Sequence, residues 1–112
     1  MSKNLIDKAC VPCRGGIPPL TFTEATTSLS DVPGWELKED ATRLYQSFKL
    51  ENFQSALNFV NKVGVIAEEE GHHPDIELGW GYAHILIFTH KISGLHENDF
   101  ILAAKIDQIF NV

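Results

Sequence analysis

The residues best suited to chemistry in this sequence are its histidines, all five of which lie between His72 and His96. His72 and His73 are adjacent and are followed by Pro74, directly after a segment with a helical pattern. A proline fixes its own backbone and biases the preceding residue toward an extended conformation, so the two imidazoles are held rigidly and point in different directions. An imidazole with a pKa near ~6.5 both donates and accepts protons near neutral pH. The pair therefore indicates general acid–base catalysis.

Each histidine also has a structural interpretation. His72 and His73 could cap the end of a helix, where an imidazolium interacts well with the last carbonyls. His90 ends a predicted strand and could form hydrogen bonds at the edge of the sheet. His84 is best interpreted as a packed or interfacial residue, and His96 as the residue that starts the last helix.

Two acidic positions are ambiguous in the same way. Asp99 lies three residues after His96, so its carboxylate could reach back to the first amide of a helix, or it could orient an imidazole of the site. Glu68 lies beside Glu69 and Glu70 near the end of a helix, where negative charge is unfavourable. A solvated acidic face is the simpler interpretation of Glu68, and membership of a pocket is the other.

Cys10 and Cys13 form a Cys-x-x-Cys pair, which in other proteins can serve redox chemistry or supply half of a zinc site. The segment that follows contains two glycines and two prolines, unlike the helix that follows a thioredoxin-type pair. A zinc site would need two more ligands, and the histidines lie about sixty residues downstream. We interpret the thiols as reduced and incidental, with an opportunistic metal or redox role as the alternative.

The elements that must position these residues can be predicted from local patterns. Residues 1–20 are expected to form an irregular arm because glycines and prolines cluster near its end. Thr21 and Glu24 match a capping box, which predicts a short helix from Thr23 to Leu29. The turn residues from Asp31 to Gly34 end that helix.

Two strand pairs and two further helices follow. Alternating polar and apolar residues predict strands at Trp35 to Leu37, Thr42 to Leu50, Ile76 to Leu78 and Tyr82 to Thr89. A long helix is predicted from Asn52 to Glu70, ended by Gly71, and a closing helix from Glu97 to Phe110. The apolar stripe of the long helix is expected to follow Phe53, Leu57, Val60, Gly64 and Ala67, with Phe59, Val63 and Ile66 widening it.

The order helix-strand-strand-helix-strand-strand-helix predicts an α+β fold, in which a four-stranded antiparallel sheet has its helices packed on one face. Residues 21–112 would form a single domain. In the last strand the face with His84, Leu86, Phe88 and His90 and the opposite face are both largely apolar. We therefore expect this strand to be covered on both sides, by helices on one and by a partner or ligand on the other.

Composition narrows the classes of function. The chain has 112 residues, 44% of them hydrophobic, and a formal net charge of -6 with its basic residues scattered. This charge balance argues against direct binding of nucleic acid or of an anionic membrane surface. No apolar run approaches the ~20 residues of a membrane-spanning helix, and the N-terminus lacks the apolar stretch of a signal peptide. We expect a cytoplasmic protein that forms a homo-oligomer, because a domain of this size gains stability from added burial.

Several of these residues together resemble the signature of pterin-4a-carbinolamine dehydratases. The matching positions, at every spacing, are Glu68, His72, His73, Pro74, Trp80, His90 and Asp99. The stretch from Cys10 to Leu20, the segment Pro33-Gly34-Trp35 and the pair Thr89-His90 also resemble the bacterial branch of the family. The resemblance covers nearly the whole chain.

The resemblance implies an enzyme that converts a 4a-hydroxytetrahydropterin into the quinonoid dihydropterin and water, in tetrahydropterin recycling. It implies a dimer or tetramer and neither metal nor cofactor. The implied catalytic residues are His72, His73 and His90. The implied substrate-binding residues are Gly71, His72, His73, Pro74, Phe88, Thr89, His90, Lys91 and Asp99.

Two rival functions remain open at this stage. Members of the family also stabilise other proteins, so this chain could be a non-catalytic partner of an aromatic amino acid hydroxylase or of a dimerising transcription factor. A Cys/His metal protein is the third interpretation, and it requires Cys10 and Cys13 to meet the histidines.

Overall fold

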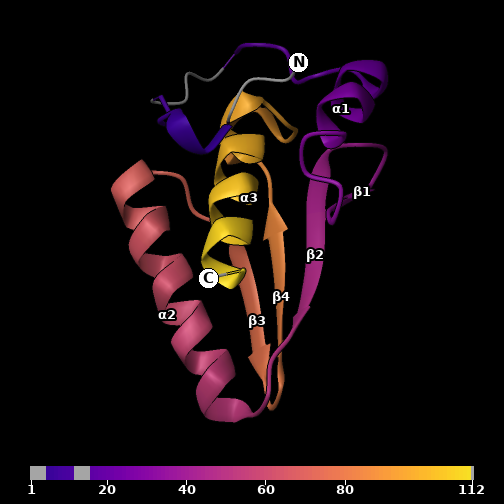
Figure 1. The fold of residues 1–112 in the computed structure, drawn as a ribbon. Helices are drawn as coiled ribbons and strands as arrows, with labels where there is room; N and C mark the ends of the chain where they lie inside the picture. The colour runs from indigo at the N-terminus through magenta and orange to yellow at the C-terminus, as the bar shows by residue number, and fades with distance from the viewer. Residues whose placement is uncertain (1–4, 12–15, 112) are drawn as a thin grey trace.

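The computed structural model describes residues 5–11 and 16–111, and its secondary structure follows the predicted order (Figure 1). The helices are α1 (Phe22–Leu29), α2 (Phe53–Glu70) and α3 (Glu97–Phe110), with short 3-10 turns η1 (Leu5–Asp7) and η2 (His90–Ile92). The strands are β1 (Glu36–Lys38), β2 (Arg43–Lys49), β3 (Asp75–Gly79) and β4 (Tyr82–Ile87). The predicted α+β class and four-stranded antiparallel sheet are confirmed. None of the described helices combines the length and apolarity needed to cross a membrane.

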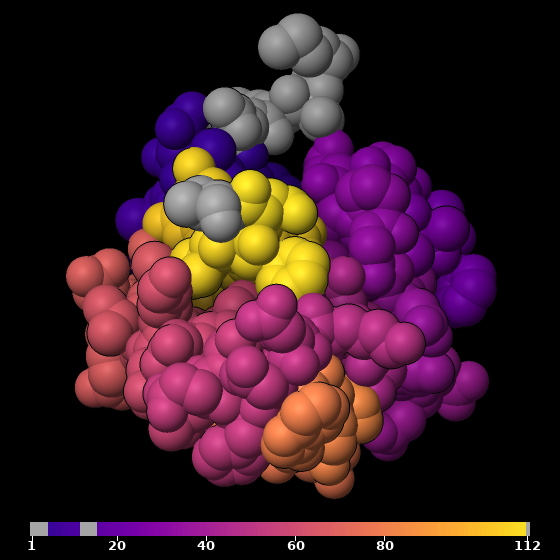
Figure 2. Space-filling model, turned by 60° about the horizontal axis from the view of Figure 1, so that its bottom comes forward, coloured from indigo at the N-terminus to yellow at the C-terminus, as the bar shows by residue number. Residues whose placement is uncertain are grey.

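The sheet has the order β1-β2-β4-β3, so the two hairpins meet through the central pair β2 and β4. Their register sets Leu44 opposite Ile87 and Phe48 opposite Ala83. All four side chains are buried, because they share the face against which α2 and α3 pack (Figures 1 and 2). The core therefore lies between this face of the sheet and the two long helices.

The opposite face of the sheet is the one that the sequence led us to expect under a partner or ligand, and that cover stays a prediction. His84, Leu86 and Phe88 on β4 and beyond it are only half-buried, and Ser47 on β2 is exposed. Among the described residues, α2 and α3 lie on the other face of the sheet (Figure 1). His84 contacts Glu77 on the neighbouring strand β3 and stacks on Tyr82.

The start of α1 confirms the capping box. The hydroxyl of Thr21 accepts a hydrogen bond from the Glu24 amide at 3.1 Å, and the Glu24 carboxylate accepts from the Thr21 amide at 2.8 Å. The helix begins at Phe22, one residue before the predicted start.

The buried side of α2 agrees with the predicted stripe in part. Phe59, Val63 and Ala67 of that stripe are buried in the core, together with Ala56, whereas Phe53 is 46% exposed. Apolar residues cover a broad arc of this helix, so their spacing alone does not identify the central line. The small side chains of Ala56 and Ala67 allow close packing, and that selects the buried side.

The end of β4 also requires a correction. The strand ends at Ile87 and not at Thr89, and His90 lies in the turn η2 rather than at the end of a strand. Thr89 forms an isolated bridge with Gly94, which turns the chain toward α3. The reversal is closed by Ser93, whose φ of 48° is in the left-handed region. This local turn ends the ladder even though the alternating pattern continues.

We expect opposite effects on stability from alanine at two glycines, one inside α2 and one at its end. Gly71 ends the helix with φ 65°, so Gly71→Ala should lower the free energy of unfolding by about 1 kcal/mol through backbone strain. Gly64 lies inside the helix and a Cβ there meets no atom within 4 Å, so Gly64→Ala should raise it by about 0.5–1 kcal/mol. Urea denaturation of both variants measures this, and equal shifts of the same sign would contradict it.

Candidate active site

Two segments converge on one open depression of the surface, of about 140 Å³. It lies between the end of α2 and the turn that follows β4. The residues that line it are Gly71, His72, His73, Thr89, His90 and Lys91. All six are among the predicted site residues, although they come from segments nearly twenty positions apart in the sequence. Of the remaining predicted residues, Asp99 lies buried next to His72 and Thr89, Phe88 packs against His90, and Pro74 leads into β3.

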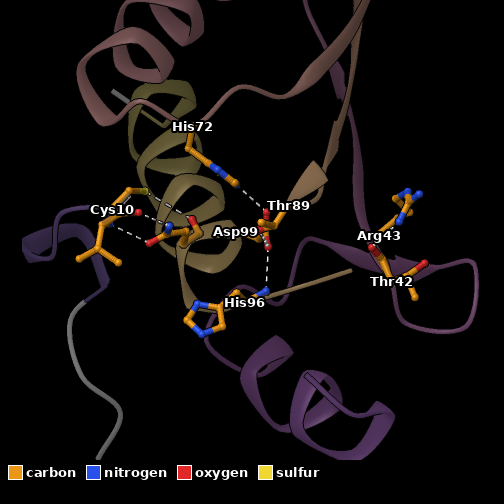
Figure 3. A network of polar contacts seen from close by, with 9 residues as sticks. Cys10, Thr42, Arg43, His72, Thr89, His96 and Asp99 are labelled. Atoms are coloured by element: carbon orange, nitrogen blue, oxygen red, sulfur yellow. Dashed lines mark hydrogen bonds and ion pairs between the residues drawn. The ribbon is translucent and has the colours of Figure 1, made fainter. Parts of the chain in front are cut away.

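His72 is positioned by the end of α2. Gly71 adopts the left-handed conformation, and the His72 amide then donates to the carbonyl of Ala67 at 3.1 Å. This closing bond directs the His72 side chain into the protein, where it is 8% exposed. Its imidazole faces Asp99, so the backbone of His72 and not its ring satisfies the end of the helix (Figure 3).

Asp99 is the fully buried carboxylate of the site. One oxygen lies 2.6 Å from His72 Nε2, and the other accepts from the Thr89 hydroxyl at 2.7 Å. The second oxygen also accepts from the His96 amide at 2.8 Å, which is the capping arrangement at the start of α3. Asp99 thus serves both interpretations that the sequence left open: it caps a helix and it contacts an active-site imidazole.

These contacts define the tautomer of His72. An ionised carboxylate only accepts hydrogen bonds, so Nε2 of His72 must carry the proton that lies between its ring and Asp99. In the neutral imidazole, Nδ1 then carries the lone pair, and it has no hydrogen-bond partner among the described residues. A histidine oriented in this way by a buried carboxylate is equipped to take up a proton at its other nitrogen.

His73 and Glu68 form a second, exposed pair. His73 Nε2 lies 2.5 Å from the Glu68 carboxylate, with the two side chains 59% and 79% exposed. A pair in solvent contributes little to stability. Its position at the rim of the depression suits a role in contacting a ligand, and it explains why Glu68 accompanies the histidines in the sequence.

His90 is held by ring contacts instead of a buried charge. Its imidazole packs on Phe88 with centroids 4.1 Å apart, and the guanidinium of Arg43 lies 3.6 Å from the centroid of the same phenyl ring. Arg43 is fixed in turn by donating to the carbonyls of Thr42 and Ser93. We did not anticipate Arg43, because only the pairing of β2 with β4 brings it to Phe88.

Two residues of interest lie away from the depression. His84 is on the open face of the sheet, where its Nδ1 lies 2.7 Å from Glu77 and its ring stacks on Tyr82. Trp80, the aromatic position of the signature, lies in the turn between β3 and β4 and is 72% exposed. This turn is at the opposite end of the hairpin from His72 (Figure 1). The signature therefore includes a position outside the local site.

Cys10 is half-buried beside α3, and burial together with the nearby Glu70 raises the pKa of its thiol to about 12. At neutral pH it is therefore a protonated, weakly reactive thiol. Cys13 lies outside the described residues. Within residues 5–11 and 16–111, no three His, Cys, Asp or Glu side chains are arranged to hold a metal ion.

Comparison with known proteins identifies the family of this chain. Residues 18–109 match the family model for pterin 4 alpha carbinolamine dehydratase. A Methylococcus capsulatus protein named "Putative pterin-4-alpha-carbinolamine dehydratase" is 58% identical over 106 residues, which cover 95% of this chain and 93% of that protein. A Halorhodospira halophila protein of the same name is 57% identical over 106 residues, 95% and 97% of the two chains. This chain belongs to the pterin-4-alpha-carbinolamine dehydratase family.

Solved structures share the fold. A transcriptional coactivator/pterin dehydratase from Brucella melitensis is 27% identical, with a TM-score of 0.77 over 82% of this chain and 98% of that one. A pterin dehydratase-like protein identified as a RuBisCO assembly factor of the alpha-carboxysome is 22% identical, with a TM-score of 0.59 over 68% and 88% of the two chains. The second likeness shows the fold alone.

The geometry around Asp99 predicts a change of tautomer in Asp99→Asn. The side-chain carbonyl of the new asparagine should face the backbone amide of His96 and the hydroxyl of Thr89, because the His96 amide can only donate. Its NH₂ group then faces His72, which must accept at Nε2 and carry its proton at Nδ1. Imidazole ¹⁵N NMR should show this switch for neutral His72. Glu77→Gln, which alters the exposed partner of His84, is the control and should leave His72 unchanged. Persistence of the Nε2–H form in Asp99→Asn would contradict the assignment.

Proposed function

We propose that this protein dehydrates a 4a-hydroxytetrahydropterin to the quinonoid dihydropterin by histidine general acid–base catalysis. The observation that carries the proposal is the buried His72–Asp99 pair, which presents an available ring nitrogen at the depression shared with His90 and His73. The family supports the substrate class, and the geometry supports the roles of the residues.

The reaction needs two proton transfers. As the bond between C4a and the hydroxyl breaks, the neighbouring nitrogen supplies an electron pair to the carbon and becomes acidic. One group must protonate the departing hydroxyl, and a second must remove the proton from nitrogen. Water and the quinonoid dihydropterin are then the products, and no redox change occurs.

The environments of the two histidines support a division of these tasks. The carboxylate of Asp99 orients the ring of His72 and faces the imidazolium that would form, so we assign His72 the nitrogen proton. His90 is exposed and exchanges protons readily with water, so we assign it the protonation of the hydroxyl. His73 at the rim holds the pterin ring, with Thr89 and Lys91 forming the opposite wall.

The proposal includes a cellular setting. We place the protein in the cytoplasm as a homodimer or homotetramer, acting after an aromatic amino acid hydroxylase in tetrahydropterin recycling. Residues 21–112 would be its single domain, preceded by the arm of residues 1–20. Size-exclusion chromatography with light scattering measures the oligomeric state.

A non-catalytic binding role is the second candidate function. It is supported by the sheet face that no described helix covers, on which Tyr45, His84 and Leu86 are half-buried and Tyr82 is exposed. The name of the Brucella melitensis protein joins a coactivator and a dehydratase, so the two roles are compatible within one fold. A protein with this role alone would bind its partner normally and leave the decay of the carbinolamine at its uncatalysed rate.

We expect His72→Ala and His90→Ala each to lower kcat roughly tenfold or more, because each removes one positioned proton carrier. His73→Ala should mainly raise KM, because it removes a binding contact. The decay of a 4a-hydroxytetrahydropterin generated in situ is followed by absorbance at pH 7 with EDTA present, after subtraction of the uncatalysed rate. His84→Ala is the matched control and should keep near-normal kcat. A His84→Ala variant slower than His72→Ala would show that the site is misassigned.

The same assay tests the metal-free mechanism. Loss of wild-type activity in EDTA, restored by zinc, would overturn that mechanism.

A further inference from the structure

Two polar residues flank the His72–Asp99 pair without lining the depression. Glu70 precedes His72 by two positions at the end of α2, and Asn98 immediately precedes Asp99 in α3. Both are largely removed from solvent: the Glu70 side chain is 13% exposed and Asn98 is 5% exposed. Neither takes part in the proton transfers proposed above, so their burial requires another explanation.

Both residues bind the backbone of the arm. The Cys10 amide donates to the Glu70 carboxylate at 2.7 Å. The side-chain amide of Asn98 accepts from the Val11 amide at 3.1 Å and donates to the Val11 carbonyl at 2.7 Å. These two hydrogen bonds satisfy the side-chain amide of Asn98 and both backbone groups of Val11, as the hydrogen bonds between neighbouring strands do.

An ion pair completes the connection. Lys105 of α3 contacts the same Glu70 carboxylate, with its side chain 15% exposed. The Cys10 amide and Lys105 together hold the pKa of Glu70 below its usual range, so the carboxylate is ionised at neutral pH. The thiol of Cys10 adds a contact to the Asn98 carbonyl at 3.6 Å. The arm thus bridges the last residue of α2 and the first turn of α3.

We infer that the Cys10–Val11 segment is a positioning strap, and that Glu70 and Asn98 are positioning residues for the His72–Asp99 hydrogen bond. The bond is only 2.6 Å long and joins residues on two separate helix ends. Its strength falls steeply with distance and angle, so the relative placement of these helix ends controls it. The strap fixes that placement through residues that do not line the depression.

The kinetic part of this inference depends on the proposed function, but the spectroscopic part does not. A proton shared between His72 Nε2 and a buried carboxylate should give a far-downfield ¹H NMR resonance in the protein without substrate. Asn98→Leu keeps the branching and the number of side-chain heavy atoms, with somewhat larger volume, and removes both hydrogen bonds to Val11. We expect its resonance to move upfield or to broaden through exchange with water, and its kcat to fall about tenfold with little change in KM.

Ile106→Val is the matched control, because Ile106 is a fully buried residue of the same helix that has no part in the strap. It should lower thermal stability while leaving the resonance and kcat unchanged. Glu70→Gln keeps an acceptor for the Cys10 amide and loses the charge that pairs with Lys105. It should therefore fall between the wild type and Asn98→Leu, and it provides the test if Asn98→Leu does not fold.

The outcomes separate the two proposals. If Asn98→Leu or Glu70→Gln lowers thermal stability as Ile106→Val does, with the resonance and kcat intact, the arm is merely structural and the inference is wrong. If the wild-type protein shows no dehydration, the proposed function fails, and the shift of the resonance still decides whether the strap positions the pair.

Discussion

A carboxylate removed from water must be satisfied by donors within the protein, and at Asp99 these donors come from three separate segments. The ring of His72 follows α2, the hydroxyl of Thr89 follows β4, and the amide of His96 starts α3. Loss of any one leaves part of a buried charge uncompensated, which is costly in a protein interior. The positions of the helix ends and of the central strand are therefore coupled through a single side chain.

The two histidines assigned to proton transfer are held by different physical means. His72 is buried and fixed by a charge, whereas His90 is exposed and packs on a phenyl ring that also contacts Arg43. A buried histidine keeps a defined tautomer, and an exposed one equilibrates with solvent. On one side of the depression His72 thus keeps a defined tautomer, and on the other side His90 is in contact with bulk water.

Local signals made much of the fold predictable. The capping box at Thr21, the left-handed glycine at Gly71 and the bounds of α3 depend on residues close in sequence, and the structure has all of them. His72, His73 and His90 lie around one depression because the β3–β4 hairpin between them brings its two ends together. The side of α2 that is buried, the role of Arg43 and the partners of Asn98 depend on contacts between distant segments. No periodicity encodes such contacts, so sequence reasoning could not reach them.

The span of the arm contacts has a consequence for biosynthesis. Cys10 and Val11 bind residues that follow them by 60 to 88 positions, and the acceptors on Asn98 belong to α3, which is synthesised well after them. The Cys10–Val11 segment must therefore wait for α3 before it can dock. Contacts of such long range form late in folding, because the loop between them must close first. The proposed turnover would then be acquired only after α3 has formed and the segment has docked, which would make turnover a reporter of a late step of folding.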